Sequence, residues 1–121
     1  MTKAYEVTLE STAEETLKQL IDYKAVNSEC RYEPDPYEDA FYRVQEIVDK
    51  AVEKLSDGLI SYKICPMLLE LGETRYHELV ESGYRFIYRL FEDENTVSIY
   101  AVIHERQDIE QILIDYCLIR L

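Results

Sequence analysis

The strongest strand signals in the chain are ESGYRFIYRL at residues 81–90 and VSIYAVIHERQD at residues 97–108. In the first, aromatic residues at positions 84, 86 and 88 alternate with two arginines and an isoleucine, which is the period-2 pattern of a β-strand. The second contains the longest apolar run of the chain, at residues 99–103, which is rich in β-branched residues. Turn residues lie at 81–83 and 92–95. We therefore predict strands at 76–80, 84–91 and 97–103 that form an antiparallel meander.

Upstream of these strands, the pattern changes to helices. Residues 5–9 alternate apolar and polar side chains and predict a first strand. Thr12 and Glu15 have the spacing of a capping box, so we predict a helix over about 12–26. Asp35 and Pro36 predict the start of a second helix, whose apolar residues follow the i, i+3, i+4 rule as far as the stop at 57–58. The two helices are expected to form an antiparallel hairpin.

The remaining segments predict one more strand, at residues 62–65, and a closing helix that begins at Asp108. Without the short strand at 62–65, the element order is β-α-α-β-β-β-α. This is an α+β domain with an N-terminal strand, a helical hairpin, a β-meander and a C-terminal helix, and the helices cover one face of the sheet. The sequence contains no repeat or linker, so residues 1–121 are predicted to form a single domain.

Composition excludes several classes of function. The chain carries 25 acidic and 13 basic residues, for a net charge of −12. Because such a charge repels phosphate and anionic lipid, we expect neither direct nucleic-acid binding nor membrane association. The sequence contains no signal peptide or membrane-spanning run, which favours a cytoplasmic protein. The three cysteines are far apart, so we expect reduced structural thiols and neither a metal site nor a cofactor.

The stretches at residues 81–90 and 97–108 resemble the C-terminal half of toxins in the RelE/ParE superfamily. The matching features are a GYR motif at 83–85, the apolar strand that follows it, and a terminal element of the H-x-R-x-D type at 104–108. That last element is closer to the ParE branch than to the RelE branch. The resemblance implies the toxin of a type II toxin–antitoxin system, neutralised by a ParD-like or other small antitoxin.

The two branches act in different ways, and the residues favour one of them. The resemblance implies either DNA gyrase inhibition, as in ParE, or ribosome-dependent cleavage of messenger RNA, as in RelE. RNA cleavage needs proton-transfer groups and cations that stabilise the phosphorane. RelE-type enzymes place lysines on the strand before the GYR motif, where this chain has Tyr76, His77 and Glu78. We therefore predict a ParE-like inhibitor of DNA gyrase with no catalytic residue.

Three sets of site residues follow from this reading. If the chain were a ribonuclease, its catalytic residues would be Arg85, His104 and Arg106. The expected target-binding residues are at the start of the closing helix and just before it: His104, Glu105, Arg106, Gln107, Asp108 and Gln111. The expected antitoxin-binding residues are mostly aromatic, since such residues are favoured at interfaces: Tyr37, Phe41, Tyr84, Arg85 and Tyr88.

Structural roles are open for the same residues. Arg85 on a strand is equally consistent with an ion-paired or solvated sheet residue. His104, at the end of an apolar strand, is more often a hydrogen-bonded structural residue than a base. A third hypothesis for the whole chain is a non-toxic member of the superfamily that acts only by binding an antitoxin.

Overall fold

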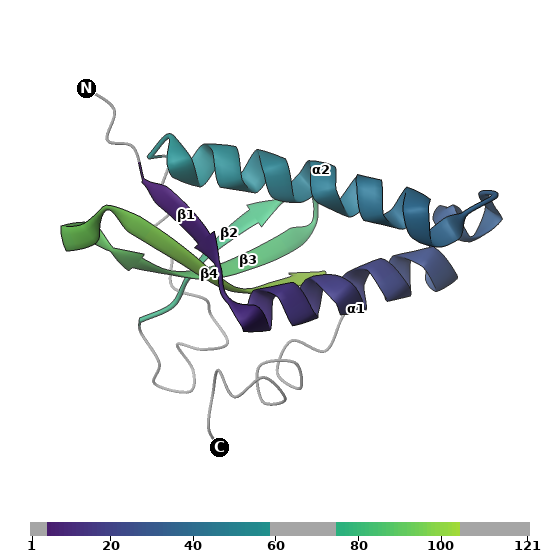
Figure 1. The fold of residues 1–121 in the computed structure, drawn as a ribbon, viewed down its shortest axis with the longest axis horizontal. Coiled ribbons are helices and arrows are strands. Elements are labelled where there is room, and N and C mark those ends of the chain that lie inside the picture. The colour runs from purple at the N-terminus through teal and green to yellow at the C-terminus, as the bar shows by residue number, and fades with distance from the viewer. Residues whose placement is uncertain (1–4, 59–74, 105–121) are drawn as a thin grey trace, which may run out of the picture.

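A four-stranded sheet carries two helices on one face in the computed structural model, which describes residues 5–58 and 75–104 (Figure 1). The elements follow the order β1 (Glu6–Leu9), α1 (Ser11–Asn27), η1 (Glu29–Tyr32), α2 (Pro36–Ser56), β2 (His77–Glu81), β3 (Tyr84–Phe91), η2 (Glu92–Glu94) and β4 (Thr96–His104). The α+β class and the helical hairpin are therefore confirmed. The strand predicted at 62–65 and the helix predicted from Asp108 lie outside the described residues.

The sheet has the strand order β1-β4-β3-β2. Strands β2, β3 and β4 pair antiparallel, as predicted for the meander, and β1 pairs parallel with β4. The β2–β3 turn has two residues, Ser82 and Gly83, with φ of 53° and 84°. Two successive positive φ values are typical of the type I′ hairpin turn, whose twist matches that of the paired strands. A β-bulge interrupts the pairing of β3 with β4 next to Ile87 and Tyr88, so Tyr100 is an extra residue on β4.

The second helix begins and ends where its sequence predicts. Oδ1 of Asp35 accepts a hydrogen bond from the backbone N–H of Glu38 at 3.0 Å, and Pro36 occupies the first helical turn. The helix stops before Gly58, which has a φ of 84°.

The capping box predicted at the start of α1 is wrong. Helix α1 begins at Ser11, and its N-cap is Glu10, which makes no side-chain cap hydrogen bond. Thr12 is already inside the helix, and its hydroxyl donates to the carbonyl of Tyr100 at 2.7 Å. The β1–β4 pairing ends at Leu9 and Ile99. Side chains from the first turns of α1 therefore supply hydrogen bonds to β4 beyond the end of β1.

Thr16 makes the most buried of these contacts. Its hydroxyl donates to the carbonyl of Ala13 at 2.8 Å and accepts from the backbone N–H of Val102 at 3.0 Å. Thr16→Val keeps the shape and leaves that N–H without its acceptor, so we expect the free energy of unfolding to fall by about 1–3 kcal/mol. Urea denaturation measures the loss. Thr16→Ser is the control, and a valine variant as stable as the serine variant would contradict this role.

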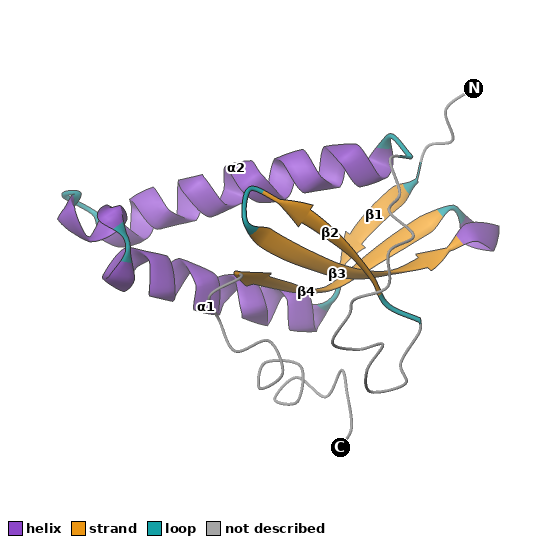
Figure 2. Ribbon diagram, turned by 180° about the vertical axis from the view of Figure 1, so that it is seen from behind, coloured by secondary structure: helices purple, strands orange, loops and turns teal. Residues whose placement is uncertain are grey.

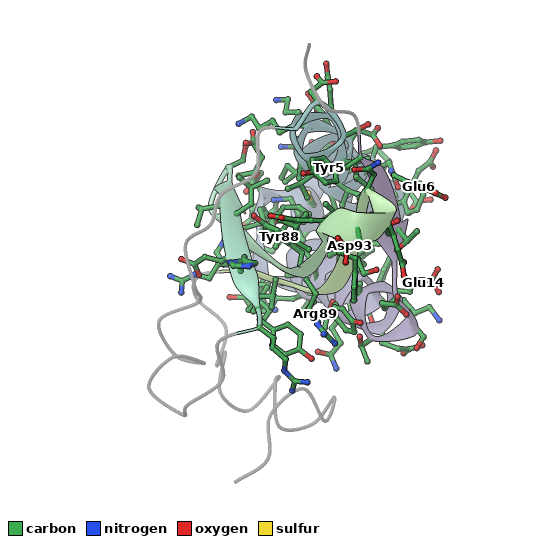
Figure 3. The ribbon with its side chains drawn as sticks, turned by 90° about the vertical axis from the view of Figure 1, so that its left-hand side faces the viewer. Tyr5, Glu6, Glu14, Tyr88, Arg89 and Asp93 are labelled. Atoms are coloured by element: carbon green, nitrogen blue, oxygen red, sulfur yellow. The ribbon has the colours of Figure 1, made fainter. Side chains whose placement is uncertain are left out.

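The core lies between the hairpin and the sheet. Tyr84, Phe86 and Tyr88 of β3 point toward the helices and are buried against Leu20 of α1 and Val48 of α2. Figure 3 shows the Tyr88 ring between the sheet and the helices. Seen from behind, in Figure 2, the closed end of the hairpin extends past the sheet. That end therefore presents helix surface that the sheet does not cover.

Candidate partner-binding site

Arg85 and His104, two of the three residues predicted for a ribonuclease, lie on opposite faces of the sheet. Arg85 pairs with Ile103, on the face away from the hairpin, and its Nη1 lies 3.6 Å from Oε2 of Glu78. The Glu78 side chain is buried, whereas that of Arg85 is 30% exposed. The pair is diagonal, because Glu78 and Arg85 are on adjacent strands two register positions apart. Arg85 is thus an ion-paired sheet residue, one of the two structural roles left open for it.

His104 lies on the other face. It pairs with Tyr84 across the β3–β4 ladder, and their ring centroids are 5.1 Å apart in an edge-to-face arrangement. The ring of Tyr23, from α1, lies 6.5 Å away. Neighbouring residues of a strand point to opposite faces, so Arg85 and His104 are separated by the thickness of the sheet. Arg106, the third residue of the set predicted for a ribonuclease, lies outside the described residues.

The residues predicted to bind the antitoxin include both exposed and buried side chains. Tyr37 and Phe41, on the first turns of α2, are 53% and 47% exposed. Tyr84 and Tyr88 belong to the core beneath the hairpin. Tyr88 is fully buried, and Tyr84 exposes only 5% of its surface, at the edge of a groove at the end of α1. Of the expected target-binding residues, the structure describes His104. The other five, at 105–108 and 111, lie beyond the described residues.

An apolar groove runs between the two helices on the side away from the sheet. Its volume is about 200 Å³, and its lining is almost entirely carbon. Phe41 forms part of its wall. The other lining residues come from both helices: Glu14, Leu17, Lys18, Ile21, Val44, Gln45 and Val48. Leu17 and Ile21 recur at helical spacing in the sequence, and that spacing gave no sign that their outer edges border a groove.

A second, more polar groove of about 490 Å³ opens where the end of α1 meets the end of β4. Lys24, Arg31 and His104 line it together with the rings of Tyr23 and Tyr32. Its acidic member, Glu29, forms an ion pair with Arg43. The groove therefore gathers basic side chains on a chain whose net charge is −12.

An ion-paired cluster ties η1 to the start of α2. Nε of Arg43 lies 2.8 Å from Oδ2 of Asp39, and its Nη1 lies 3.1 Å from Oε1 of Glu29. The hydrogen bond from the Cys30 thiol, followed by that from Arg43, lowers the pKa of Asp39. A backbone hydrogen bond and then the charge of Lys24 lower the pKa of Glu29. Burial, then the hydrogen bond to Asp39, raises the pKa of Cys30.

These lowered pKa values predict a loss of stability in acid. A carboxyl whose pKa is lower in the folded state stabilises it above the ordinary pKa of about 4, and this contribution disappears as the pH falls through the lowered value. We therefore expect Glu29→Gln/Asp39→Asn to flatten the fall in melting temperature between about pH 5 and 3. Circular dichroism measures it, with Glu53→Gln as the matched control. Equal slopes for the wild type and the double variant would rule out this contribution.

Neither metal chemistry nor a membrane span appears in the described part of the chain. Residues 5–58 and 75–104 contain no cluster of three side chains suited to hold a metal ion. None of the helices described is both long and apolar enough to cross a membrane. Cys30, the cysteine in the described ranges, is a buried free thiol.

Comparison with known proteins identifies the family. Residues 7–109 match the family model described as the ParE toxin of the type II toxin–antitoxin system parDE. No curated protein matches the chain. Among solved structures, the fold is similar to the toxin–antitoxin complex RelBE2 from Mycobacterium tuberculosis, with a TM-score of 0.58, 21% identity, and coverage of 88% of this chain and 98% of that one. It is also similar to a variant of the E. coli toxin RelE in the free state, with a TM-score of 0.50, 16% identity, and coverage of 93% and 96%.

Proposed function

Because the chain belongs to the ParE toxin family of type II toxin–antitoxin systems, we propose that it inhibits DNA gyrase in the cytoplasm by binding to it. A cognate antitoxin then neutralises it by covering part of its surface. In this proposal the protein acts through protein–protein contacts and has no catalytic residue.

The main support for a non-catalytic protein is the separation of Arg85 from His104. A ribonuclease that uses the 2′-OH as its nucleophile needs a proton-transfer group and cations that converge on one phosphate. Here Arg85 and His104 point to opposite faces of the sheet. The charge of Arg85 is also directed toward the buried carboxylate of Glu78. This arrangement supports binding in place of RNA cleavage.

RelE-type cleavage of messenger RNA is the second candidate, and Arg85 is the residue that favours it. It occupies the arginine position of the GYR motif, and its side chain is 30% exposed beside Glu78. A cation in this place is a feature that a phosphate would use.

The apolar groove of the hairpin is the proposed antitoxin site. The RelBE2 structure is a toxin–antitoxin complex, and its similarity in fold supports a bound antitoxin here as well. A segment that folds on binding gains most of its affinity from apolar side chains buried in such a groove. The half-exposed ring of Phe41, at the wall of the groove, is suited to receive them.

A gyrase assay with a paired substitution separates the two candidates. Glu78→Gln/Arg85→Gln removes both charges together, so neither is left buried without its partner. We expect the wild type and this double variant to inhibit supercoiling by purified gyrase to the same extent, within about twofold, since neither residue contacts the target in the proposal. A wild type without effect on gyrase contradicts the proposal. A double variant that no longer arrests growth favours the ribonuclease.

A further inference from the structure

An exposed stripe of three residues follows the outer side of α2, next to the apolar groove. It consists of Glu38, Tyr42 and Glu46, which we call the acidic stripe. Because these residues are four apart, they lie one above another along the helix, with Cβ atoms about 5–6 Å apart. Tyr42 is 63% exposed. Its ring meets that of Phe41 edge to face, with centroids 5.5 Å apart, so the stripe adjoins the groove.

An exposed aromatic ring between two carboxylates has the chemistry to bind a guanidinium group. The ring face attracts the cation, and carboxylate oxygens accept its N–H donors. Both contacts already occur nearby in the chain. The Cζ of Arg31 lies over the Tyr32 ring, 4.6 Å from its centroid, and Arg43 is hydrogen-bonded to Asp39 at 2.8 Å.

The charges around the stripe favour the same kind of ligand. Residues 28–43 contain five acidic and two basic residues, and the whole chain has a net charge of −12. Lys50 lies 3.8 Å from Glu46, but both side chains are more than half exposed, so this ion pair is weak. An approaching cationic segment is attracted by this field, whereas a second copy of the same chain is repelled.

We propose that the acidic stripe and the groove together bind an amphipathic helix of the antitoxin, one that carries arginines along one edge and apolar side chains along the other. The apolar edge fills the groove beside Phe41, and the arginines stack on Tyr42 between Glu38 and Glu46. The identity of the occupant as an antitoxin rests on the proposed function. The preference for arginine rests on the stripe alone.

Two synthetic peptides test this preference on the full-length protein. They share the same apolar positions and one tryptophan, and their polar positions hold arginine in one peptide and glutamate in the other. The chain itself contains no tryptophan, so fluorescence reports only the peptide. We expect the arginine peptide to bind and the glutamate peptide not to. We expect Tyr42→Ser to weaken binding of the arginine peptide about three- to fivefold, and Glu38→Gln/Glu46→Gln to weaken it and reduce its salt dependence.

A charge-matched variant separates the stripe from the general field of the protein. Asp93→Asn/Glu94→Gln removes two exposed carboxylates at η2, the same number as the stripe variant removes, at the end opposite the hairpin tip (Figures 1 and 3). We expect it to leave peptide affinity unchanged within about twofold. Equal binding of the two peptides, or an equal loss from the η2 variant and the stripe variant, would overturn the inference.

The peptide experiment and the toxicity experiment test the two proposals separately. Peptide binding requires no toxicity, so a chain that does not arrest growth but prefers the arginine peptide contradicts the proposed function and supports the stripe. A chain that blocks gyrase and shows no preference between the peptides contradicts the stripe alone.

Discussion

Replacement of Phe41 by aspartate is expected to free the protein from control by its antitoxin. The ring is 47% exposed and forms a wall of the apolar groove between α1 and α2. Aromatic side chains at such places are frequent hot spots, and loss of one costs about 2 kcal/mol or more, equal to about thirtyfold in affinity. A carboxylate in its place also loses hydration when an apolar segment covers it. Co-expressed antitoxin should then no longer restore growth.

Val26→Asp is the matched control for this variant. Val26 is 55% exposed on α1 and lies outside the lining of the groove, so the same change in chemistry is made on the same hairpin. We expect antitoxin to restore growth of this variant, and calorimetric titration should show wild-type affinity. If Val26→Asp and Phe41→Asp lose protection equally, the groove is not the antitoxin site.

Phe86→Ala is expected to give the largest loss of stability. The side chain is fully buried between the sheet and the hairpin. Truncation of a buried phenylalanine typically costs about 3–5 kcal/mol, through lost burial and the cavity that remains. Because a domain of this size is stable by only about 5–15 kcal/mol, the variant should be close to unfolding at 37 °C.

Urea denaturation of Phe86→Ala and Phe86→Leu measures this effect. Leucine keeps most of the apolar volume, so its loss should be clearly smaller. Phe86 also fixes both helices on the sheet, and the alanine variant should therefore lose antitoxin binding along with its stability. An alanine variant as stable as the leucine variant would show that the core does not depend on this ring.

The sequence predicted those helix ends and turns that are determined by a few neighbouring residues. Asp35 and Pro36 marked the start of α2, and Ser82 with Gly83 marked the β2–β3 turn, because capping and positive φ act within a few residues. Long-range features were missed. The bulge at Tyr100 depends on the register between two strands, and the hydrogen bonds from α1 to β4 join residues more than 80 positions apart.

The same distinction applies to the candidate site. The alternation in β3 correctly placed Tyr84 and Tyr88 on one face and Arg85 on the other. It did not say which face the hairpin covers, so two core tyrosines were included among the partner-binding residues. The rings of Tyr37 and Phe41 are exposed on the second helix, and their role in antitoxin binding stays a prediction. The groove beside Phe41 needs both helices and could not be predicted from either one.

Pulse-labelling after induction without antitoxin shows which cellular process the protein blocks first. Incorporation of labelled thymidine and labelled amino acids is followed over the first minutes in a bacterial host. Inhibition of gyrase predicts an early fall in DNA synthesis while protein synthesis continues. An early fall in protein synthesis, or no change in either, would contradict the proposed function.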